Sequence, residues 1–353
     1  MHTTRKLGSI QIVRAIEKHT NADSLELVTV LGWQVVSKIG DVHVGDKVIY
    51  CEVDSMLPLE TEWITSAISE RAKQNGTNDF FRIKTIRLRW ELSQGLIIPL
   101  SDKLPPFPNM DEGTDVTEIL GIRKYEPIAF SGMYATAGGG GGAASAADQF
   151  PTQFLDKTDE PRIQSEPKLL HLLKGKPFYI AIKFDGTSAT YFIDPHTQEL
   201  VVCSRNLIRK RPSDPNTCPY WRIVLKYDIE QKLRQMPHIA IQGEICGPSI
   251  QKNPLKLKDI ELYVFNLVDI RDKSRLSPDK MLDLCSNTMH IPVVTFEETG
   301  ESFAYDSIKV LLSKAEGLYA GTKHPREGIV IRSADQTISF KVINNEYLLK
   351  NGY

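Results

Sequence analysis

The chain has 353 residues, 41% hydrophobic and 25% charged, a composition typical of a globular protein long enough for two domains. Its 43 Lys and Arg residues against 44 Asp and Glu residues give a formal net charge of −1. This balance excludes a uniformly basic nucleic-acid-coating protein, so any site for a polyanion must be local.

The cysteines and the lengths of the apolar runs indicate which cellular compartment the protein occupies. The five cysteines are scattered, odd in number and without paired metal-ligand spacing, so we expect reduced thiols in an intracellular, reducing compartment. No apolar run approaches membrane-spanning length, and residues 1–10 lack the hydrophobic core of a secretory signal. We expect no membrane partner, and no protein partner is evident.

The first part of the chain is predicted to be a small β-barrel domain over residues 1–125. Short runs typical of strands are separated by Gly, Asn and Asp turns. These runs are residues 8–16, 25–40, 46–53, 80–90 and 95–100.

Within the run 80–90, four basic residues precede Trp90: Arg82, Lys84, Arg87 and Arg89. A solvated outer face is one interpretation. The other is a barrel face that binds a nucleic-acid phosphate backbone, with Trp90 beside it. Residues 1–124 carry 15 Lys and Arg against 17 Asp and Glu, which limits the strength of such a patch.

A compositional break follows the first domain. Residues 133–151 are rich in Gly, Ala and Ser and cannot form a hydrophobic core. We therefore expect a flexible linker or loop over residues 126–150.

Residues 151–353 are predicted to form an α+β domain around antiparallel sheet. Helical periodicity marks three segments and strand-like patterning marks five others. The expected helices are 167–175, 220–236 and 305–319, and the expected strands are 200–206, 239–246, 261–270, 327–333 and 337–344.

The stretch FYIAIKFDG, residues 178–186, places two charges in an apolar run. Alternation puts Lys183 and Asp185 on one face, and Gly186 permits a tight turn into a second strand, residues 187–193. A surface hairpin with a solvated ion pair is the ordinary interpretation of one such motif.

Further polar residues stand at or near the expected strands: Arg205, Glu244, Glu327 and Lys341. Singly, each is more often a surface or ion-paired residue. Together with Lys183 and Asp185 they supply a nucleophilic amine, three carboxylates and several cations. This combination suits a polyphosphate with a divalent metal.

Six segments in order resemble the motifs of the covalent nucleotidyltransferases, which comprise ATP-dependent DNA ligases, RNA ligases and mRNA capping guanylyltransferases. They are KFDG (183–186), SRN (204–206), QGEICGPSIQ (242–251), YVFNLVDI (263–270), EGIVIR (327–332) and SFKVINNEYL (339–348). Upstream, FLDKTDEPRIQ (154–164) resembles the segment that precedes the nucleophile in RNA ligases.

The resemblance extends to the first domain, which is similar to the OB-fold module of a small RNA ligase group. Only residues 342–353 follow Lys341, too few for the C-terminal OB domain of DNA ligases and capping enzymes. The expected fold is α+β: an OB-type barrel, then an antiparallel-sheet-based, ATP-grasp-like nucleotidyltransferase domain over residues 151–353. Trp90 stands where a small or polar residue is expected, and Ile343 replaces a second motif lysine.

The resemblance implies a reaction. Lys183 attacks the α-phosphorus of ATP and forms lysyl-AMP, its neutral amine favoured by burial and adjacent cations. Asp185, Glu244 and Glu327 would position Mg²⁺ or Mn²⁺, partly through its waters.

Other residues of the cofactor site follow from the same resemblance. Arg162 and Lys341 would neutralise phosphate charge. Gly186 lies in the nucleophile motif, and Arg205 would hold the ribose or the donor strand. Phe265 would stack on adenine, although an aromatic residue in such a run is more often core. The roles of Asn266 and Asp269 stay open.

The implied partner is RNA with 3′-OH and 5′-phosphate ends, with a nicked duplex as the expected form and repair as the expected task. Arg82, Lys84, Arg87 and Arg89 would bind it. Two alternatives stay open. One is a capping guanylyltransferase, and the other is a non-catalytic RNA-binding protein on a ligase scaffold.

Overall fold

The computed structural model describes residues 5–59, 79–100, 109–125 and 149–352. Most of the expected linker, residues 126–148, lies outside them. The chain divides into two compact units. Unit 1 comprises Met1–Pro127, Pro161–Lys168 and Asn345–Tyr353, and unit 2 comprises Ile128–Glu160 and Leu169–Asn344. Two segments that the sequence analysis placed in the second domain, residues 161–168 and Asn345–Tyr353, therefore belong to unit 1.

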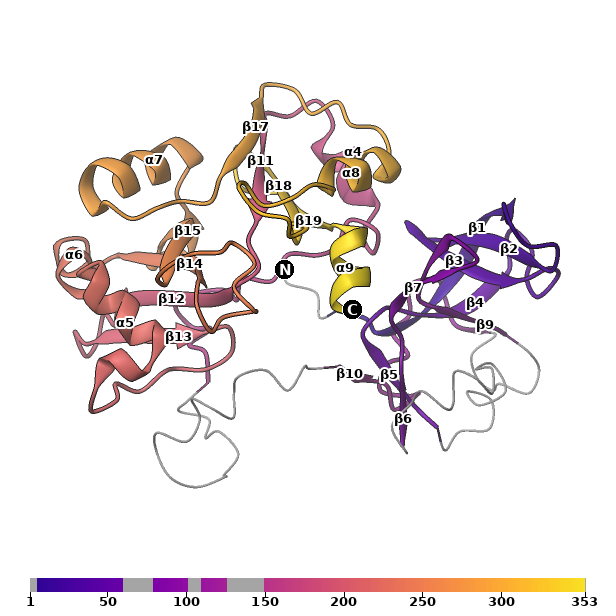
Figure 1. Ribbon diagram of the computed structural model, residues 1–353, viewed down its shortest axis with the longest axis horizontal. Helices are drawn as coiled ribbons and strands as arrows, with labels where there is room; N and C mark the ends of the chain where they lie inside the picture. The colour runs from indigo at the N-terminus through magenta and orange to yellow at the C-terminus, as the bar shows by residue number, and fades with distance from the viewer. Residues whose placement is uncertain (1–4, 60–78, 101–108, 126–148, 353) are drawn as a thin grey trace. The chain divides into compact units, whose positions relative to one another are not determined.

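Unit 1 is built from antiparallel strands (Figure 1). Its elements are β1 (Gly8–Lys18), β2 (Leu25–Val30), β3 (Trp33–Lys38), β4 (Lys47–Cys51), β5 (Ser55–Pro58), β6 (Phe80–Arg82), β7 (Thr85–Leu88), β8 (Glu91–Gln94), β9 (Leu96–Pro99), β10 (Arg123–Lys124) and α9 (Asn345–Asn351). The strand orders are β3-β2-β1-β4-β9, β10-β5-β6 and β7-β8.

The long strand β1 connects two parts of this barrel-like unit. Its first half, Gly8–Ile12, pairs with β4, and its second half pairs with β2 beyond an irregularity between Val13 and Ala15. Such a bulge bends a strand, which lets one strand serve two sheet surfaces. Trp33 and Tyr50 fill the enclosed core, fully buried with ring centroids 6.4 Å apart.

Unit 2 contains two antiparallel sheets flanked by helices, with strand orders β17-β11-β18-β19 and β13-β12-β14-β15-β16. The strands are β11 (Phe178–Lys183), β12 (Thr187–Ile193), β13 (Leu200–Ser204), β14 (Ile239–Cys246), β15 (Glu261–Asp269), β16 (Ser274–Arg275), β17 (Phe296–Gly300), β18 (Gly328–Ser333) and β19 (Ser339–Ile343). The helices are α4 (Lys168–Leu173), η3 (Pro215–Thr217), α5 (Pro219–Lys226), α6 (Ile229–Gln235), α7 (Pro278–Asp283), η4 (Leu284–Met289) and α8 (Ile308–Ala315).

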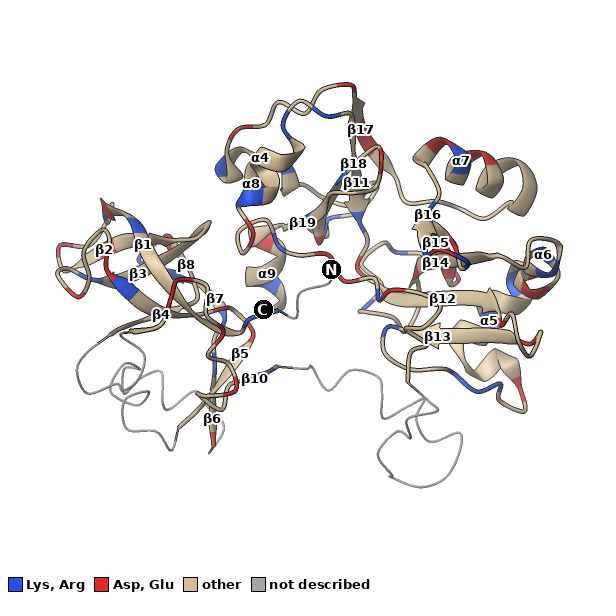
Figure 2. Cartoon of the chain, turned by 180° about the vertical axis from the view of Figure 1, so that it is seen from behind, with Lys and Arg blue, Asp and Glu red and all other residues tan. Residues whose placement is uncertain are grey.

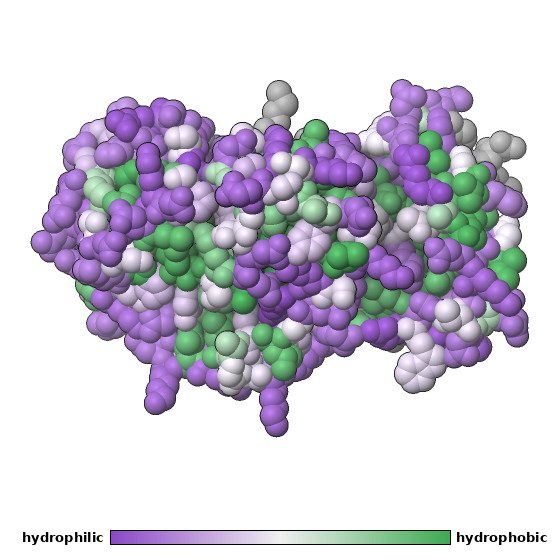
Figure 3. Space-filling view, turned by 90° about the horizontal axis from the view of Figure 1, so that it is seen from above, coloured by the Kyte–Doolittle hydropathy of each residue, from purple (hydrophilic) through white to green (hydrophobic). Residues whose placement is uncertain are grey.

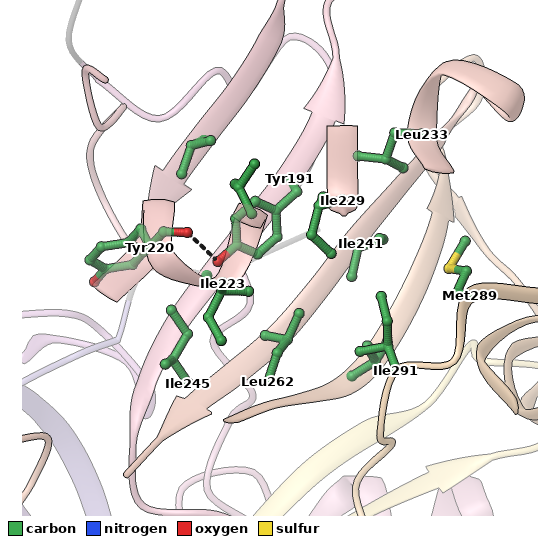
Figure 4. Packing of buried hydrophobic residues seen from close by; sticks show 14 of the residues in the cluster. Tyr191, Tyr220, Ile223, Ile229, Leu233, Ile241, Ile245, Leu262, Met289 and Ile291 are labelled. Atoms are coloured by element: carbon green, nitrogen blue, oxygen red, sulfur yellow. Dashed lines mark hydrogen bonds between the residues drawn. The ribbon is translucent and has the colours of Figure 1, made fainter. Parts of the chain in front are cut away.

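The main core of unit 2 lies between the second sheet and helices α5 and α6 (Figure 4). Tyr191 of β12 is fully buried there, and its hydroxyl donates to the carbonyl of Tyr220, 3.2 Å away. Ile223, Ile229 and Leu233 are completely buried among these strands. Burial of each such side chain stabilises the folded state by about 1.5–3 kcal/mol. This burial determines which face of the sheet packs against the helices.

The single helix expected over residues 220–236 is wrong, because the structure has two helices, α5 and α6. Asp228, at the N-cap position of α6, adopts a left-handed backbone with φ 51° between the two helices. The break turns the chain so that Tyr220 and Trp221 in one helix and Leu233 in the other all reach the core.

The face shown in Figure 3 carries hydrophilic side chains together with hydrophobic patches, and acidic and basic residues are interspersed along the chain (Figure 2). Among the large hydrophobic side chains in the described ranges, Trp90 is the most exposed, at 77%. In the part of the chain that the structure describes, no helix is long and apolar enough to cross a membrane.

Candidate active site

The lysine of the KFDG motif ends strand β11 and meets a carboxylate from the neighbouring strand. Lys183 pairs with Gly328 in the β11–β18 ladder, which brings Glu327 alongside. The Lys183 Nζ donates to Glu327 Oε2 at 2.7 Å, and the two side chains are only 25% and 17% exposed. The motif is therefore not a solvated surface hairpin, because the lysine is paired with a residue 144 positions away.

The turn after Lys183 brings the other two carboxylates of the predicted set near it. Strand β12 pairs with β14, with Ser188 opposite Glu244. Gly186 permits this approach, since a Cβ there would lie 2.3 Å from the carbonyl oxygen of Ile245 and 2.8 Å from Glu244 Cγ. Close packing against β14 thus requires glycine at this position.

The electrostatics of this cluster are dominated by its carboxylates. Burial raises the pKa of Glu244 to about 8, and the charges of Glu327 and Asp185 add to the rise while Lys183 opposes it. Burial alone would lower the pKa of Lys183, but Glu327, Glu244 and Asp185 outweigh it and raise it. In this arrangement of carboxylates around Lys183 the ammonium form is favoured. The expected cationic environment included a bound divalent metal, so the expectation of a neutral amine stays a prediction.

The two other cations of the predicted site in unit 2 converge on a carboxylate that the sequence analysis did not identify. Lys341 in β19 donates from Nζ to Asp159 at 2.8 Å, and Arg205 pairs with the same carboxylate. Asp159 is half-exposed, whereas Lys341 is largely buried at 18% exposure. Asp159 lies within the segment 154–164 that resembles RNA ligases, but its pairing could not be predicted because its partners lie 46 and 182 residues away.

A buried ion network also escaped the sequence analysis. Arg332 of β18 donates to Glu160 at 2.8 Å, and Arg275 lies 3.5 Å from the same carboxylate. Burial would raise the pKa of Glu160, but Arg332 and Arg275 outweigh it and lower it. Arg332 also donates to Asn266, so Asn266 has a structural role in the network.

Tyr319 is a further residue that the sequence analysis missed, since it stands at the end of an expected helix without a distinguishing pattern. Its side chain is buried, and its hydroxyl donates to the carbonyl of Lys183 at 2.9 Å. The same oxygen accepts the backbone N–H of Glu327 at 3.1 Å. Tyr319 thus joins the two residues of the buried ion pair through their backbones.

Phe265 and Arg162 lie in different units. Phe265 is partly buried in unit 2 and packs against an apolar cluster that includes Tyr179 and Phe184. Arg162 belongs to unit 1, where it lies 3.6 Å from Asp54 and over the ring of Trp33 at 5.7 Å.

The four basic residues expected to bind RNA have different environments in unit 1. Arg82 is held by Asp54 at 2.8 Å and lies over the ring of Tyr125, 3.3 Å from its centroid. Arg87 pairs with Glu346 of α9 at 2.7 Å. The remaining two, Lys84 and Arg89, are exposed. Arg82 and Arg87 are thus paired with carboxylates, whereas the exposed Lys84 and Arg89 could contact a phosphate backbone.

The carboxylates near Lys183 have the chemistry of a Mg²⁺ or Mn²⁺ site, because hard divalent cations prefer carboxylate oxygens. The described residues include no group of three or more His, Cys, Asp or Glu side chains gathered closely enough to hold a metal ion. Asp185, Glu244 and Glu327 are thus not gathered closely enough in this structure to hold a metal ion by themselves, and their role as its ligands stays a prediction.

Comparison with known proteins identifies the class of the first domain and then the family of the whole chain. Residues 7–100 match an OB-fold domain, and residues 176–345 match the RNA ligase family. No curated protein matches the chain.

Solved structures of an RNA ligase from Naegleria gruberi are similar over nearly the full chain. A ligand-free variant has 30% identity and a TM-score of 0.85, covering 98% of this chain and 97% of that one. The ligase with pyrophosphate and a variant with ATP and manganese each have 30% identity and a TM-score of 0.84, covering 98% of both chains. The chain belongs to the RNA ligase family. The expected fold, an OB domain followed by a sheet-rich ligase domain, is confirmed.

Proposed function

We propose that this RNA ligase is ATP-dependent and works through a lysyl-AMP intermediate on Lys183. The observation that carries the proposal is the buried Lys183–Glu327 pair, 2.7 Å long, beside Asp185 and Glu244. A structural ion pair has no need of two further carboxylates, which raise the cost of burying negative charge. A site that handles a triphosphate and a metal requires them.

The reaction uses the chain's own groups as follows. Lys183 loses a proton and its nitrogen bonds to the α-phosphorus of ATP as the bond to pyrophosphate breaks. The AMP group then passes to an RNA 5′-phosphate and frees Lys183. A 3′-hydroxyl attacks the activated phosphorus, loses its proton and releases AMP, which seals the ends.

Asp185, Glu244 and Glu327 are the residues that would hold Mg²⁺ or Mn²⁺. The metal supplies positive charge that offsets both these carboxylates and the phosphates. The Naegleria ligase variants with ATP or AMP and manganese support the use of ATP and a divalent metal.

The cations and the aromatic residue take the remaining roles. Within unit 2, Lys341 binds phosphate oxygens, Arg205 holds the ribose or donor strand, and Phe265 stacks on adenine. Lys341 and Arg205 share Asp159 in this structure, so a phosphate that binds them competes with that carboxylate.

The proposed substrate is a nicked RNA duplex with 3′-OH and 5′-phosphate ends, sealed in RNA repair. We further propose an intracellular, reducing compartment. All five cysteines are free thiols, and burial raises the pKa of Cys203 and Cys285 to about 12, which protects both from oxidation.

The test is incubation of the purified protein with α-labelled ATP and Mg²⁺ or Mn²⁺. We expect label on the protein that pyrophosphate removes, and no label from α-labelled GTP. Label from GTP alone would establish a capping guanylyltransferase. Absence of any adduct would leave a non-catalytic RNA-binding protein.

A further inference from the structure

We propose that Trp90, at the tip of the β7–β8 hairpin, is a stacking platform for a base of the RNA substrate. The proposal rests on the ligase function above. It adds a base-binding residue in the OB domain to the basic residues already considered.

The backbone at Trp90 is unfavourable for a bulky residue. Leu88 pairs with Glu91, so Arg89 and Trp90 alone form the turn, with φ of 47° and 80°. Two-residue hairpins of this kind require positive φ at both positions and favour Asn-Gly. A tryptophan at the second position therefore strains the turn.

The side chain at this strained position is also exposed. The indole of Trp90 is 77% exposed and contributes little to the packing of unit 1. Because both the strain and the exposed apolar surface oppose folding, stability does not explain the residue. Strained residues retained against their cost cluster at binding sites.

Side chains of unit 1 hold the backbone of the hairpin that carries Trp90. Arg87 donates from Nη1 to the carbonyl of Trp90 at 3.0 Å, and its Nη2 is paired with Glu346. Further down, Gln34 of β3 donates to the carbonyl of Leu92 at 2.8 Å. A fixed platform loses little entropy when a ligand binds.

The charges around the tip select RNA as the occupant. Arg89 is exposed in the β7–β8 turn, and Lys84 is exposed just before β7. Their positive charges complement phosphates. Every base offers a flat face to an indole, so such stacking tolerates any sequence. A ligase that seals breaks needs this tolerance.

The experiment compares Trp90→Gly with Trp90→Phe in the full chain. Glycine suits the turn, so we expect Trp90→Gly to keep or raise the melting temperature. Its affinity for nicked RNA should fall about tenfold at every salt concentration, with the salt slope unchanged. Trp90→Phe should retain most of the affinity, and both variants should form lysyl-AMP at the wild-type rate.

The matched electrostatic variant is Lys84→Ala with Arg89→Ala, which should instead reduce the salt slope of binding. Equal RNA affinity of Trp90→Gly and the wild type would overturn the stacking proposal. Formation of lysyl-AMP by the wild type is measured in a separate assay. Its failure there would overturn the ligase mechanism.

A second, independent inference concerns unit 2: we infer that Tyr319 is a positioning residue for Lys183. Lys183 and Gly328 form the last pair of the β11–β18 ladder, and the hydroxyl of Tyr319 joins the strands there. The Tyr319 ring packs edge-on against Phe184, with centroids 5.9 Å apart. One buried oxygen thus sets the spacing of Lys183 and Glu327.

Tyr319→Phe removes only this oxygen, and Tyr191→Phe is its matched control. The Tyr191 hydroxyl is also buried and also donates to a carbonyl, but it lies in the α5–α6 core. We expect similar losses of melting temperature in both. Only Tyr319→Phe should slow single-turnover lysyl-AMP formation, about 10- to 100-fold, with the half-saturating ATP concentration unchanged.

Equal rates of lysyl-AMP formation in the two variants would overturn the positioning role of Tyr319. If the wild type itself acquires no label, the lysyl-AMP mechanism fails and this inference with it.

Discussion

Lys183→Ala is expected to abolish labelling of the protein by α-labelled ATP. The Nζ atom of Lys183 is the proposed bond-forming atom, and alanine offers no replacement nucleophile. Alanine also leaves Glu327 without its 2.7 Å partner, so some stability is lost. Labelling and melting temperature are measured together.

Lys183→Arg separates the chemical loss from the structural one. Arginine keeps a positive charge beside Glu327 but stays protonated, so it cannot attack phosphorus. We expect a melting temperature near that of the wild type and no label. Both Lys183 variants should still seal nicked RNA that already carries a 5′-adenylate, because that step does not use the amine. Stable label on either variant would contradict the assignment of Lys183.

Several parts of this site could be predicted from the sequence because they depend on local patterning. The order of the motifs associated Lys183 and Asp185 with Glu244 and Glu327. Strand alternation applies only as far as Lys183, where β11 ends, so the turn after it rather than alternation positions Asp185. The β18 and β19 strands were expected at 327–333 and 337–344 and are found at Gly328–Ser333 and Ser339–Ile343.

The partners that complete the site could not be predicted, because they come from distant segments. Glu160 and Arg332 are 172 residues apart, and Tyr319 and Lys183 are 136 apart. Neither pair produces a periodic signal. Strand alternation also says which residues share a face but not which are neutralised there, so it missed the pairing of Arg82 with Asp54.

The charge state of Lys183 shows the same limit. Burial and neighbouring cations were expected to favour the free amine, and the fold also places three carboxylates around Lys183, which raise its pKa. The sequence identified every one of those carboxylates but assigned them to the metal. Their direct effect on the lysine depends on distances that only the fold sets.

Substitution of the three carboxylates is expected to have the second large effect. Asp185→Ala, Glu244→Ala and Glu327→Ala should each lower nick sealing about 100-fold or more, because each removes a carboxylate proposed to hold the metal, whose positive charge offsets the phosphates. Unlike the Lys183 variants, they should also fail on pre-adenylated RNA, since the same metal site serves that step.

The isosteric variants Glu244→Gln and Glu327→Gln test the charge itself. We expect both to need higher Mn²⁺ concentrations for half-maximal activity, because an amide oxygen binds a hard cation more weakly than a carboxylate does. Glu298→Gln is the matched control in unit 2, where Glu298 pairs with Lys314 at 2.6 Å in a different part of the sheet. It should lose some stability and keep its Mn²⁺ dependence. Near wild-type sealing by any of the three Ala variants would remove that carboxylate from the site. An unchanged Mn²⁺ dependence in both Gln variants would mean that the carboxylates hold Lys183 rather than the metal.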